Sequence, residues 1–546
     1  MTLKLGPVLR TFWPAIVGVA LFAYFYFLNV RHIGLNEIWA HGVAWRLLGG
    51  TARAFDSAGD LLNFPLNIGF FHGLGDAYLS IPFVWLFGHT TTALTWHYFT
   101  FAAFSIILIH RISLLLYHDA WAAAWSCLML AATPSFVTMA FGASDCALGS
   151  FTFGLAGIYW ALRYADERRP RLAYLGCFCL GAALSCRAYA AALLAGLLTF
   201  AIIHRTRLQS LLPGGRARRS FLAGCCGAFL LFMLPFLLAI LQDPHGFATA
   251  WGDGLRHAWG GRDHFTFWDN IWIRIKQLRA LLNGKLLLDS LVRKPDDYRV
   301  FGGGIILMSA LAGILWTYRC EGPIRRRLPG IVVLVSLMLA PFSPTVLRLH
   351  HLCPILPHLL LAAGSLIALT TAPKHRPWVL AVLFLLLAGR IWNSTIFFHR
   401  MEAELSQTGG VSPTEIEIMS GPPLLRAYND LAECLSEMGV PEAIMLNYGP
   451  VKSVTYLTGG SVQASNILPV RNRRYDTLLY DSQLEGLSRK TAAAFVVDIT
   501  PGGFQLLFQA FQRKLALSNK RLSLRRTIRR PNGEPVYAVY QIAPRS

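Results

Sequence analysis

Acidic residues near the ends of apolar segments have the clearest chemical potential in this sequence. The stretch that follows the first apolar run contains four of them, Glu37, Asp56, Asp60 and Asp76. A carboxylate held at a membrane surface is partly desolvated, which raises its pKa toward values that suit a general base. Glu37 opens an amphipathic stretch and fits that role. The alternative is that it is a first-turn acid that the helix dipole favours.

Three further features mark the ends of later apolar runs. Asp145 precedes one run, where it serves either as a helix cap or as a functional acid. Arg187 stands alone in a short turn, where a guanidinium is well suited to contact a lipid phosphate. Arg348 with His350 and His351 marks another turn, as an anion contact or as plain interface residues.

The elements that must position these residues are apolar helices. Hydrophobic residues make up 54% of the sequence and charged residues 14%, and the mean hydropathy is +0.45. This composition is typical of a membrane protein. About eleven spans are predicted from apolar runs at 12–30, 93–109, 120–133, 147–162, 172–184, 188–203, 221–241, 303–316, 330–341, 352–369 and 379–391.

The distribution of Lys and Arg predicts the orientation of the chain. Such residues near the ends of spans collect in cytoplasmic loops. The short loops of the opposite parity carry only Arg187 and Arg348, so the N-terminus is predicted inside and the C-terminal segment outside. Eighteen basic residues lie in the alternate loops: Lys4, Arg10, Arg111, Arg163, Arg168, Arg169, Arg171, Arg205, Arg207, Arg216, Arg218, Arg219, Arg319, Arg325, Arg326, Arg327, Lys374 and Arg376.

Charge and cysteine content exclude other classes of function. Much of the net charge of +21 lies in those cytoplasmic loops, where topology and anionic lipids account for it without nucleic acid. Most of the ten cysteines lie in or beside spans, and Cys434 alone falls in the exported tail, so that tail has no internal disulfide. We find no metal-ligand spacing and assign no cofactor, although a divalent metal is left open.

The predicted organisation is a membrane domain, residues 1–396, followed by an exported α/β domain, residues 397–546. The long outer loops 31–92 and 242–301 are expected to hold structure and function. The first contains the amphipathic helix 37–48. In the tail, strands are predicted at 443–446, 453–457, 494–498 and 536–540 after a helix at 422–439, and Thr458-Gly459-Gly460 reads as a plain turn.

In order and spacing, these motifs resemble the GT-C superfamily of polyprenyl-phosphate-sugar-dependent glycosyltransferases, especially its protein O-mannosyltransferase and aminoarabinose transferase branch. The matching segments are Asn36-Glu37 with the Ala44–Gly50 helix, Tyr78–Gly88, Thr133-Pro134 with Asp145, Ser185-Cys186-Arg187, and His350–Pro357. Two departures stand out. Asn36 replaces the usual catalytic Asp, and His350-His351 replaces an Arg-Tyr pair.

The resemblance implies transfer of a sugar from a polyprenyl-phosphate donor to a protein, lipid or glycan acceptor at the outer face of a bacterial inner membrane, with inversion. Glu37 would be the base beside Asn36, Asp145 would orient the acceptor or sugar, and Asp56 and Asp60 are the next candidate acids. The departing phosphate would be held by Arg187, Arg348, His350 and His351. Two rivals stay open, a lipid or glycan flippase and a non-catalytic relative, the latter because of Asn36.

Overall fold

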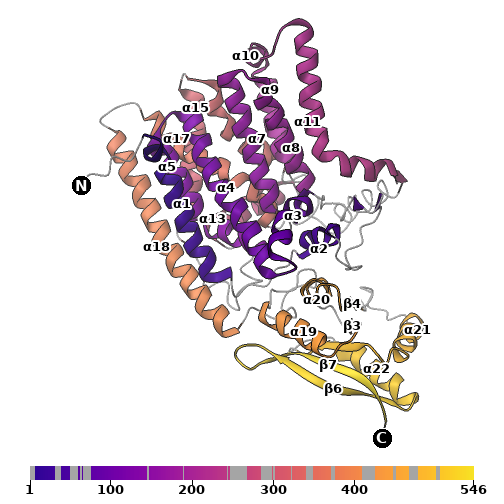
Figure 1. The fold of residues 1–546 in the computed structure, drawn as a ribbon. Coiled ribbons are helices and arrows are strands. Elements are labelled where there is room, and N and C mark those ends of the chain that lie inside the picture. The colour runs from indigo at the N-terminus through magenta and orange to yellow at the C-terminus, as the bar shows by residue number, and fades with distance from the viewer. Residues whose placement is uncertain are drawn as a thin grey trace.

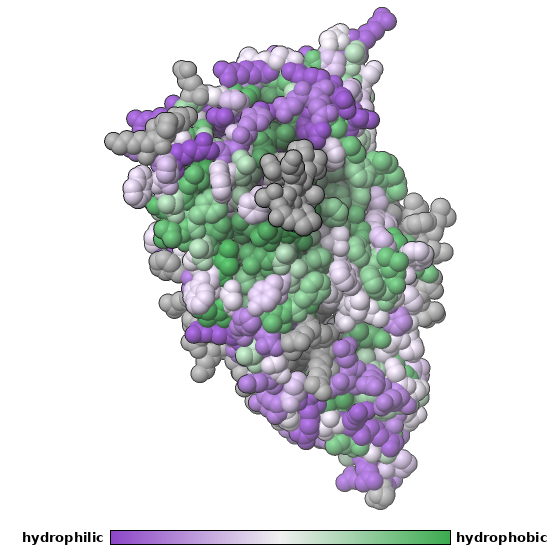
Figure 2. Space-filling view, turned by 60° about the vertical axis from the view of Figure 1, so that its left-hand side comes forward, coloured by the Kyte–Doolittle hydropathy of each residue, from purple (hydrophilic) through white to green (hydrophobic). Residues whose placement is uncertain are grey.

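The computed structural model consists of a helical bundle and a smaller C-terminal α/β unit (Figure 1). A broad hydrophobic surface lies between hydrophilic regions at the two ends of the molecule (Figure 2), as expected for a bundle whose middle faces lipid. The described residues are 7–30, 38–48, 60–61, 64–65, 75–143, 147–187, 190–242, 244–245, 267–284, 298, 300, 302–320, 322–339, 349–370, 375–408, 425–446, 451–466, 477–499 and 505–545.

Several bundle helices start at residues that favour a helix N-terminus. Asp119 caps α5 by accepting hydrogen bonds from the backbone N–H groups of Trp121 (2.9 Å) and Ala122 (3.0 Å). Proline occupies the first turn of α6, α8 and α17, where no N–H is needed. The bundle comprises α1 (Pro7–Asn29), α4 (Thr91–Tyr117), α5 (Ala120–Ala131), α6 (Pro134–Thr138), the π-helical η3 (Met139–Ala143), α7 (Ala147–Glu167), α8 (Pro170–Cys186), α9 (Ala190–Ile203), α10 (Arg205–Gln209), α11 (Gly215–Gln242), α15 (Gly303–Arg319), η5 (Ile324–Arg327), α16 (Leu328–Leu339), η7 (Leu349–Ile355), α17 (Leu356–Leu369) and α18 (Arg376–Thr408).

Each of the eleven predicted apolar runs lies largely within one or two of these helices. Among the described residues, five helical segments are long and apolar enough to cross a membrane, and the pair α5 and α6, bent by 56°, would add a sixth. Helices such as α8, α9 and α15 are apolar but shorter. The chain is thus a membrane protein with several apolar helices, and the count of eleven spans stays a prediction.

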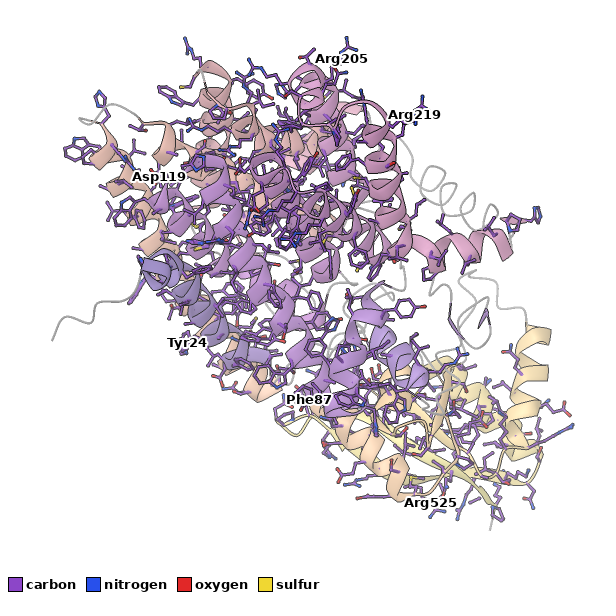
Figure 3. The ribbon with its side chains drawn as sticks, turned by 45° about the horizontal axis from the view of Figure 1, so that its top comes forward. Tyr24, Phe87, Asp119, Arg205, Arg219 and Arg525 are labelled. Atoms are coloured by element: carbon purple, nitrogen blue, oxygen red, sulfur yellow. The ribbon has the colours of Figure 1, made fainter. Side chains whose placement is uncertain are left out.

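Polar contacts gather several basic turns at the end of the bundle away from the C-terminal sheet. Arg325 of η5 donates a hydrogen bond to Asp166 near the end of α7 (2.6 Å). Arg168, in the turn before α8, donates to the carbonyl of Ser210 beside α10 (3.0 Å). Figure 3 shows Arg205 at this end, opposite the C-terminal unit. Turns that the charge rule predicts to be cytoplasmic therefore share one end, and the side of the membrane on which they lie stays a prediction.

The two long loops that are predicted to lie outside both contain helices. The first holds α2 (Ile38–Leu47), β1 (Asp60–Leu61) paired antiparallel with β2 (Phe64–Pro65), and α3 (Gly75–Phe87). The second contains α13 (Phe267–Leu282). The predicted amphipathic helix at 37–48 thus corresponds to α2. Its residues His41, Val43 and Ala44 are fully buried, so α2 packs against protein on at least one face.

The C-terminal unit is a five-stranded sheet in the order β4-β3-β5-β7-β6, with helices on both faces. Strand β3 runs parallel to β4 and β5, and β7 runs antiparallel to β5 and β6. The core on one face includes residues of α19 and α20, and the core on the other includes residues of α21 and α22. The elements are α19 (Leu425–Glu437), β3 (Glu442–Met445), α20 (Val451–Leu457), β4 (Gln463–Asn466), α21 (Thr477–Ser488), β5 (Ala494–Asp498), α22 (Gln505–Leu517), β6 (Lys520–Arg529) and β7 (Pro535–Pro544).

One predicted strand is wrong. Residues 453–457, predicted as a strand, form the helix α20. The helix is buried on two sides, since Val454 joins the core of the sheet unit and Tyr456 joins the core of the bundle. Tertiary packing of this kind overrides a weak local propensity.

Candidate functional site

Of the predicted site residues, Arg187 is the one whose side chain the structure describes. Only the backbone is described for Asp60, in β1, and for His350 and His351, in η7. The remaining predicted residues lie outside the described residues, and these are Asn36, Glu37, Asp56, Asp145 and Arg348.

Arg187 ends α8 and starts the short turn to α9. Its extended backbone (φ −155°, ψ 133°) stops the helix, while its N–H still donates to the carbonyl of Ala183 (3.1 Å). The Arg187 carbonyl then accepts from the N–H of Ala190, which begins α9 (3.1 Å). The residue is only 2% exposed. The turn predicted from Ser185-Cys186-Arg187 is therefore present, and its cation is held inside the protein.

Asp76 is an acid that the structure places beside this turn. It lies in the first turn of α3 and is fully buried. The preceding residue, Gly75, packs so closely on Cys186 that an added Cβ would lie 2.9 Å from the Cys186 sulfur and 2.9 Å from its backbone nitrogen. The start of α3 is thereby fixed against the end of α8, one residue before Arg187.

Gly149 of α7 completes this close packing. A Cβ at Gly149 would overlap the carboxylate oxygen Oδ1 of Asp76 and would lie 3.2 Å from the sulfur of Cys186. Only glycine leaves room for the acid between the two helices. Three helix ends meet here, because Asp76 starts α3, Gly149 lies in the first turn of α7 and Cys186 ends α8.

A small cavity adjoins this group. Its volume is about 10 Å³, close to the least space that admits one water molecule. Ser150 and His358 are each 2% exposed, and Ser150 Oγ and His358 Nδ1 have no hydrogen-bond partner among the described residues. The lining residues are Ser150, Phe151, Leu155, Ala190, Leu193, Pro354, Pro357 and His358.

The cavity shows which predicted motifs the fold brings together. Its walls come from the start of α7, which follows Asp145 in the chain, from the start of α9, which follows Arg187, from η7, which contains His350-His351, and from α17 after it. These motifs are far apart in the sequence and their helices converge at one place. Chemically, the convergence offers a buried carboxylate, a buried guanidinium and two polar groups facing a cavity.

Asp76 and His358 are the residues that sequence reasoning did not select. Asp76 was one of the four acids in the first outer loop but had no distinguishing signal, because its proximity to α7 and α8 arises from tertiary packing. The neighbouring glycines, Gly75 and Gly149, were the available hint, since glycine permits close approach. No group of three or more His, Cys, Asp or Glu side chains with the geometry to hold a metal occurs among the described residues.

Comparisons with known proteins agree with this architecture. Residues 72–236 match the family model of dolichyl-phosphate-mannose-protein mannosyltransferase. The fold is similar to that of ArnT from Cupriavidus metallidurans bound to undecaprenyl phosphate, with a TM-score of 0.59 and 11% identity, covering 98% of each chain. It is also similar to the Archaeoglobus fulgidus oligosaccharyltransferase AglB in complex with an inhibitory peptide and a dolichol-phosphate. There the TM-score is 0.53 and the identity 13%, over 97% of this chain and 74% of that chain.

No curated protein sequence matches the chain. The family match and the similar folds confirm the resemblance to the GT-C superfamily of glycosyltransferases that the order of motifs indicated. The matched segment begins four residues before Asp76 and ends within α11, so it contains both Asp76 and Arg187.

Proposed function

We propose that this protein transfers a sugar from a polyprenyl-phosphate donor to a protein, lipid or glycan acceptor at the outer face of a bacterial inner membrane. The observation that carries the proposal is the buried Arg187, which follows Cys186 at the point where α3, α7 and α8 pack around the buried Asp76 in a GT-C-like fold. A fixed cation in a site of low dielectric stabilises the charge that develops on a leaving phosphate. The bound lipid phosphates of ArnT and AglB support the class of donor.

In this proposal each residue has a distinct task. Glu37 takes the proton of the acceptor hydroxyl or amine, and a single activating carboxylate of this kind leads to inversion at the sugar. Asp145 orients the acceptor or the sugar. Arg187, with Arg348 and the His350-His351 pair, holds the lipid phosphate. Asp76 is an additional acid of the site, and its burial suits a positioning role.

The donor site can be tested with undecaprenyl phosphate as the probe. We expect Arg187→Ala to weaken binding of this lipid by about 10- to 150-fold, because a hydrogen bond to a charged group contributes about 1.5–3 kcal/mol. Arg187→Lys should lose less. Arg207→Ala is the control, since Arg207 is an exposed cation on α10. Equal affinity of the Arg187→Ala variant and the control for the lipid would remove Arg187 from the site.

The base is tested by Glu37→Gln, which keeps shape and removes the basic charge. Turnover should fall by roughly 10²- to 10⁴-fold while the protein still folds. Asp56→Asn and Asp60→Asn are controls from the same loop, and Asn36→Asp should be tolerated. Normal transfer by Glu37→Gln together with loss in one control would show that the base is misassigned.

The transferase class itself is tested in cells. Mass spectrometry of envelope glycans, lipids and glycoproteins, with and without the gene, should reveal one acceptor that lacks a sugar in the deletion strain. Restoration by the wild-type chain but not by Glu37→Gln is expected. An unchanged set of acceptors, together with altered lipid distribution between the leaflets, would favour a flippase instead.

A further inference from the structure

Helix α20 of the C-terminal unit is inserted into the bundle. The side chain of Tyr456 is fully buried, and it belongs to the hydrophobic core of the bundle instead of the core beneath the sheet. Its hydroxyl lies 3.4 Å from the carbonyl oxygens of Gly88 and Thr90, in the turn between α3 and α4. Figure 1 shows α20 between the sheet and α2.

His89 lies at the centre of this contact. Its ring packs against Trp45 of α2 with 4.8 Å between ring centroids, and Tyr456 meets it edge-on at 6.4 Å. Burial lowers the pKa of His89 and so favours the neutral form of the ring. We call Trp45, His89, Tyr456 and Gly459 the α20 joint.

Gly459 closes the joint from the other side. It follows α20 with φ +61°, and an added Cβ would lie 2.8 Å from Nε2 of the His89 ring. Its N–H donates to the carbonyl of Tyr456 (3.0 Å), and that of Gly460 donates to Thr455 (2.9 Å), which together end the helix. The Thr458-Gly459-Gly460 turn therefore both ends α20 and makes room for His89.

The α20 joint contacts α2 through Trp45, and other residues of α2 contact α3 and α4 of the bundle. His41 of α2 shares a hydrogen bond with His97 of α4 between Nε2 and Nδ1 (3.2 Å). Ala44 packs with Val84 of α3 and Ala93 of α4. Helix α2 is thus enclosed between the bundle and α20. In the chain it directly follows Asn36-Glu37, so its placement determines where the proposed base can lie.

We propose that the C-terminal unit positions α2 through the α20 joint, and that Tyr456 and Gly459 are positioning residues for transfer. The catalytic part of this inference rests on the proposed function. The placement of α2 does not, because it can be measured without any substrate.

The joint can be disrupted by one methyl group. Gly459→Ala forces the turn away from His89, whereas Gly439→Ala is a matched control with nearly the same backbone angle (φ +62°) and no atom within 4 Å of its Cβ. The double variant Gly459→Ala with His89→Ala removes the obstructing ring. A defect that comes from the contact itself is reversed in the double variant, whereas a defect from backbone strain appears equally in Gly439→Ala and persists.

The experiment measures hydrogen exchange and transfer on the full-length protein in nanodiscs. In Gly459→Ala we expect exchange protection in both α20 and α2 to fall on the order of tenfold, with recovery in the double variant. We expect kcat to fall by about 10- to 100-fold. KM for the lipid donor should change by less than about threefold, because Arg187 follows Cys186, which packs on the start of α3, whereas the joint lies beyond the end of that helix.

Unchanged exchange in α2 would overturn the proposal, as would equal loss in Gly439→Ala or a defect that the double variant retains. If Gly459→Ala loses exchange protection in α2 but keeps a normal kcat, the positioning role in catalysis is overturned. If the wild-type protein transfers no sugar but its exchange behaves as expected, the proposed function fails and the placement of α2 by the joint stands.

Discussion

The close approach of Asp76 to Gly149 leads to a quantitative prediction. In Gly149→Ala the new methyl group would overlap Oδ1 of Asp76 and lie 3.2 Å from the Cys186 sulfur. The carboxylate cannot retreat freely, because Gly75 beside it already packs on Cys186. Overpacking of this kind costs about 1–3 kcal/mol, partly offset by about 0.5–1 kcal/mol from replacing glycine in a helix.

A matched control separates the overpacking cost from the stability gained by replacing a helical glycine. Gly304 is the second residue of α15, and nothing lies within 4 Å of its added Cβ, so Gly304→Ala gains the helix preference without a clash. The difference in stability between the two variants is then the overpacking cost, about 1–3 kcal/mol, or roughly 1–3 °C in melting temperature for a chain of this length. Intrinsic-fluorescence melting of the purified protein measures it.

A second substitution identifies the obstructing group. Asp76→Ser shortens the side chain and so relieves the clash in the Gly149→Ala background. The double variant should therefore be more stable than the sum of the two single effects predicts, by roughly 0.5–3 kcal/mol, the usual coupling between residues in contact. Equal melting temperatures for Gly149→Ala and Gly304→Ala, or strict additivity in the double variant, would mean that the carboxylate does not lie against α7.

Three other outcomes are expected. Arg390 of α18 is 1% exposed and donates to the carbonyl of Leu282 at the end of α13. Arg390→Leu should therefore cost about 1.5–3 kcal/mol in thermal melting, and Arg400→Leu, exposed on the same helix, little. Reporter fusions after residues 171, 219 and 327 should report the cytoplasm and a fusion after residue 546 the outside, and a cytoplasmic C-terminus would contradict the predicted orientation. Because burial lowers the pKa of His89, its neutral form stabilises the joint above about pH 6.5; that contribution should be lost as the pH falls toward the lowered pKa. Hydrogen exchange in α20 at pH 7.5 and 5.5 checks this, with His89→Gln expected to reduce the pH dependence.

The sequence predicted those features that arise from local pattern. Apolar runs identified the helices of the bundle, and compact hydrophobic segments identified β3, β5 and β7. Strand β6 was not predicted, because its 10 residues from Lys520 to Arg529 are dominated by charged and polar side chains, as befits the edge of a sheet. Helix α20 was assigned to a strand, because it is buried on two sides and so lacks the one-sided pattern of an amphipathic helix.

The candidate site likewise contains one residue that the sequence pattern reveals and one that only tertiary packing reveals. Arg187 was identified because a lone outer cation is visible as an exception to the charge rule in the sequence itself. Asp76 was not selected, since its significance depends on which helices pack beside it. Two glycines on different helices, Gly75 and Gly149, allow that packing. Their spacing in the sequence carries no information about the fact that both lie against Cys186.

The two ends of the bundle use arginine in opposite ways, and the contrast bears on function. At the end away from the C-terminal sheet, Arg325 pairs with Asp166, and the side chain of Arg376, which pairs with Asp119, is 43% exposed. Topology alone accounts for these cations. Arg187 is 2% exposed, in a turn that is predicted to lie outside, where the same rule disfavours a positive charge. Burying a guanidinium costs several kcal/mol in desolvation, and such ions rarely repay that cost in stability. In the proposed function, the interaction that offsets this cost is the one between Arg187 and the phosphate of the lipid donor.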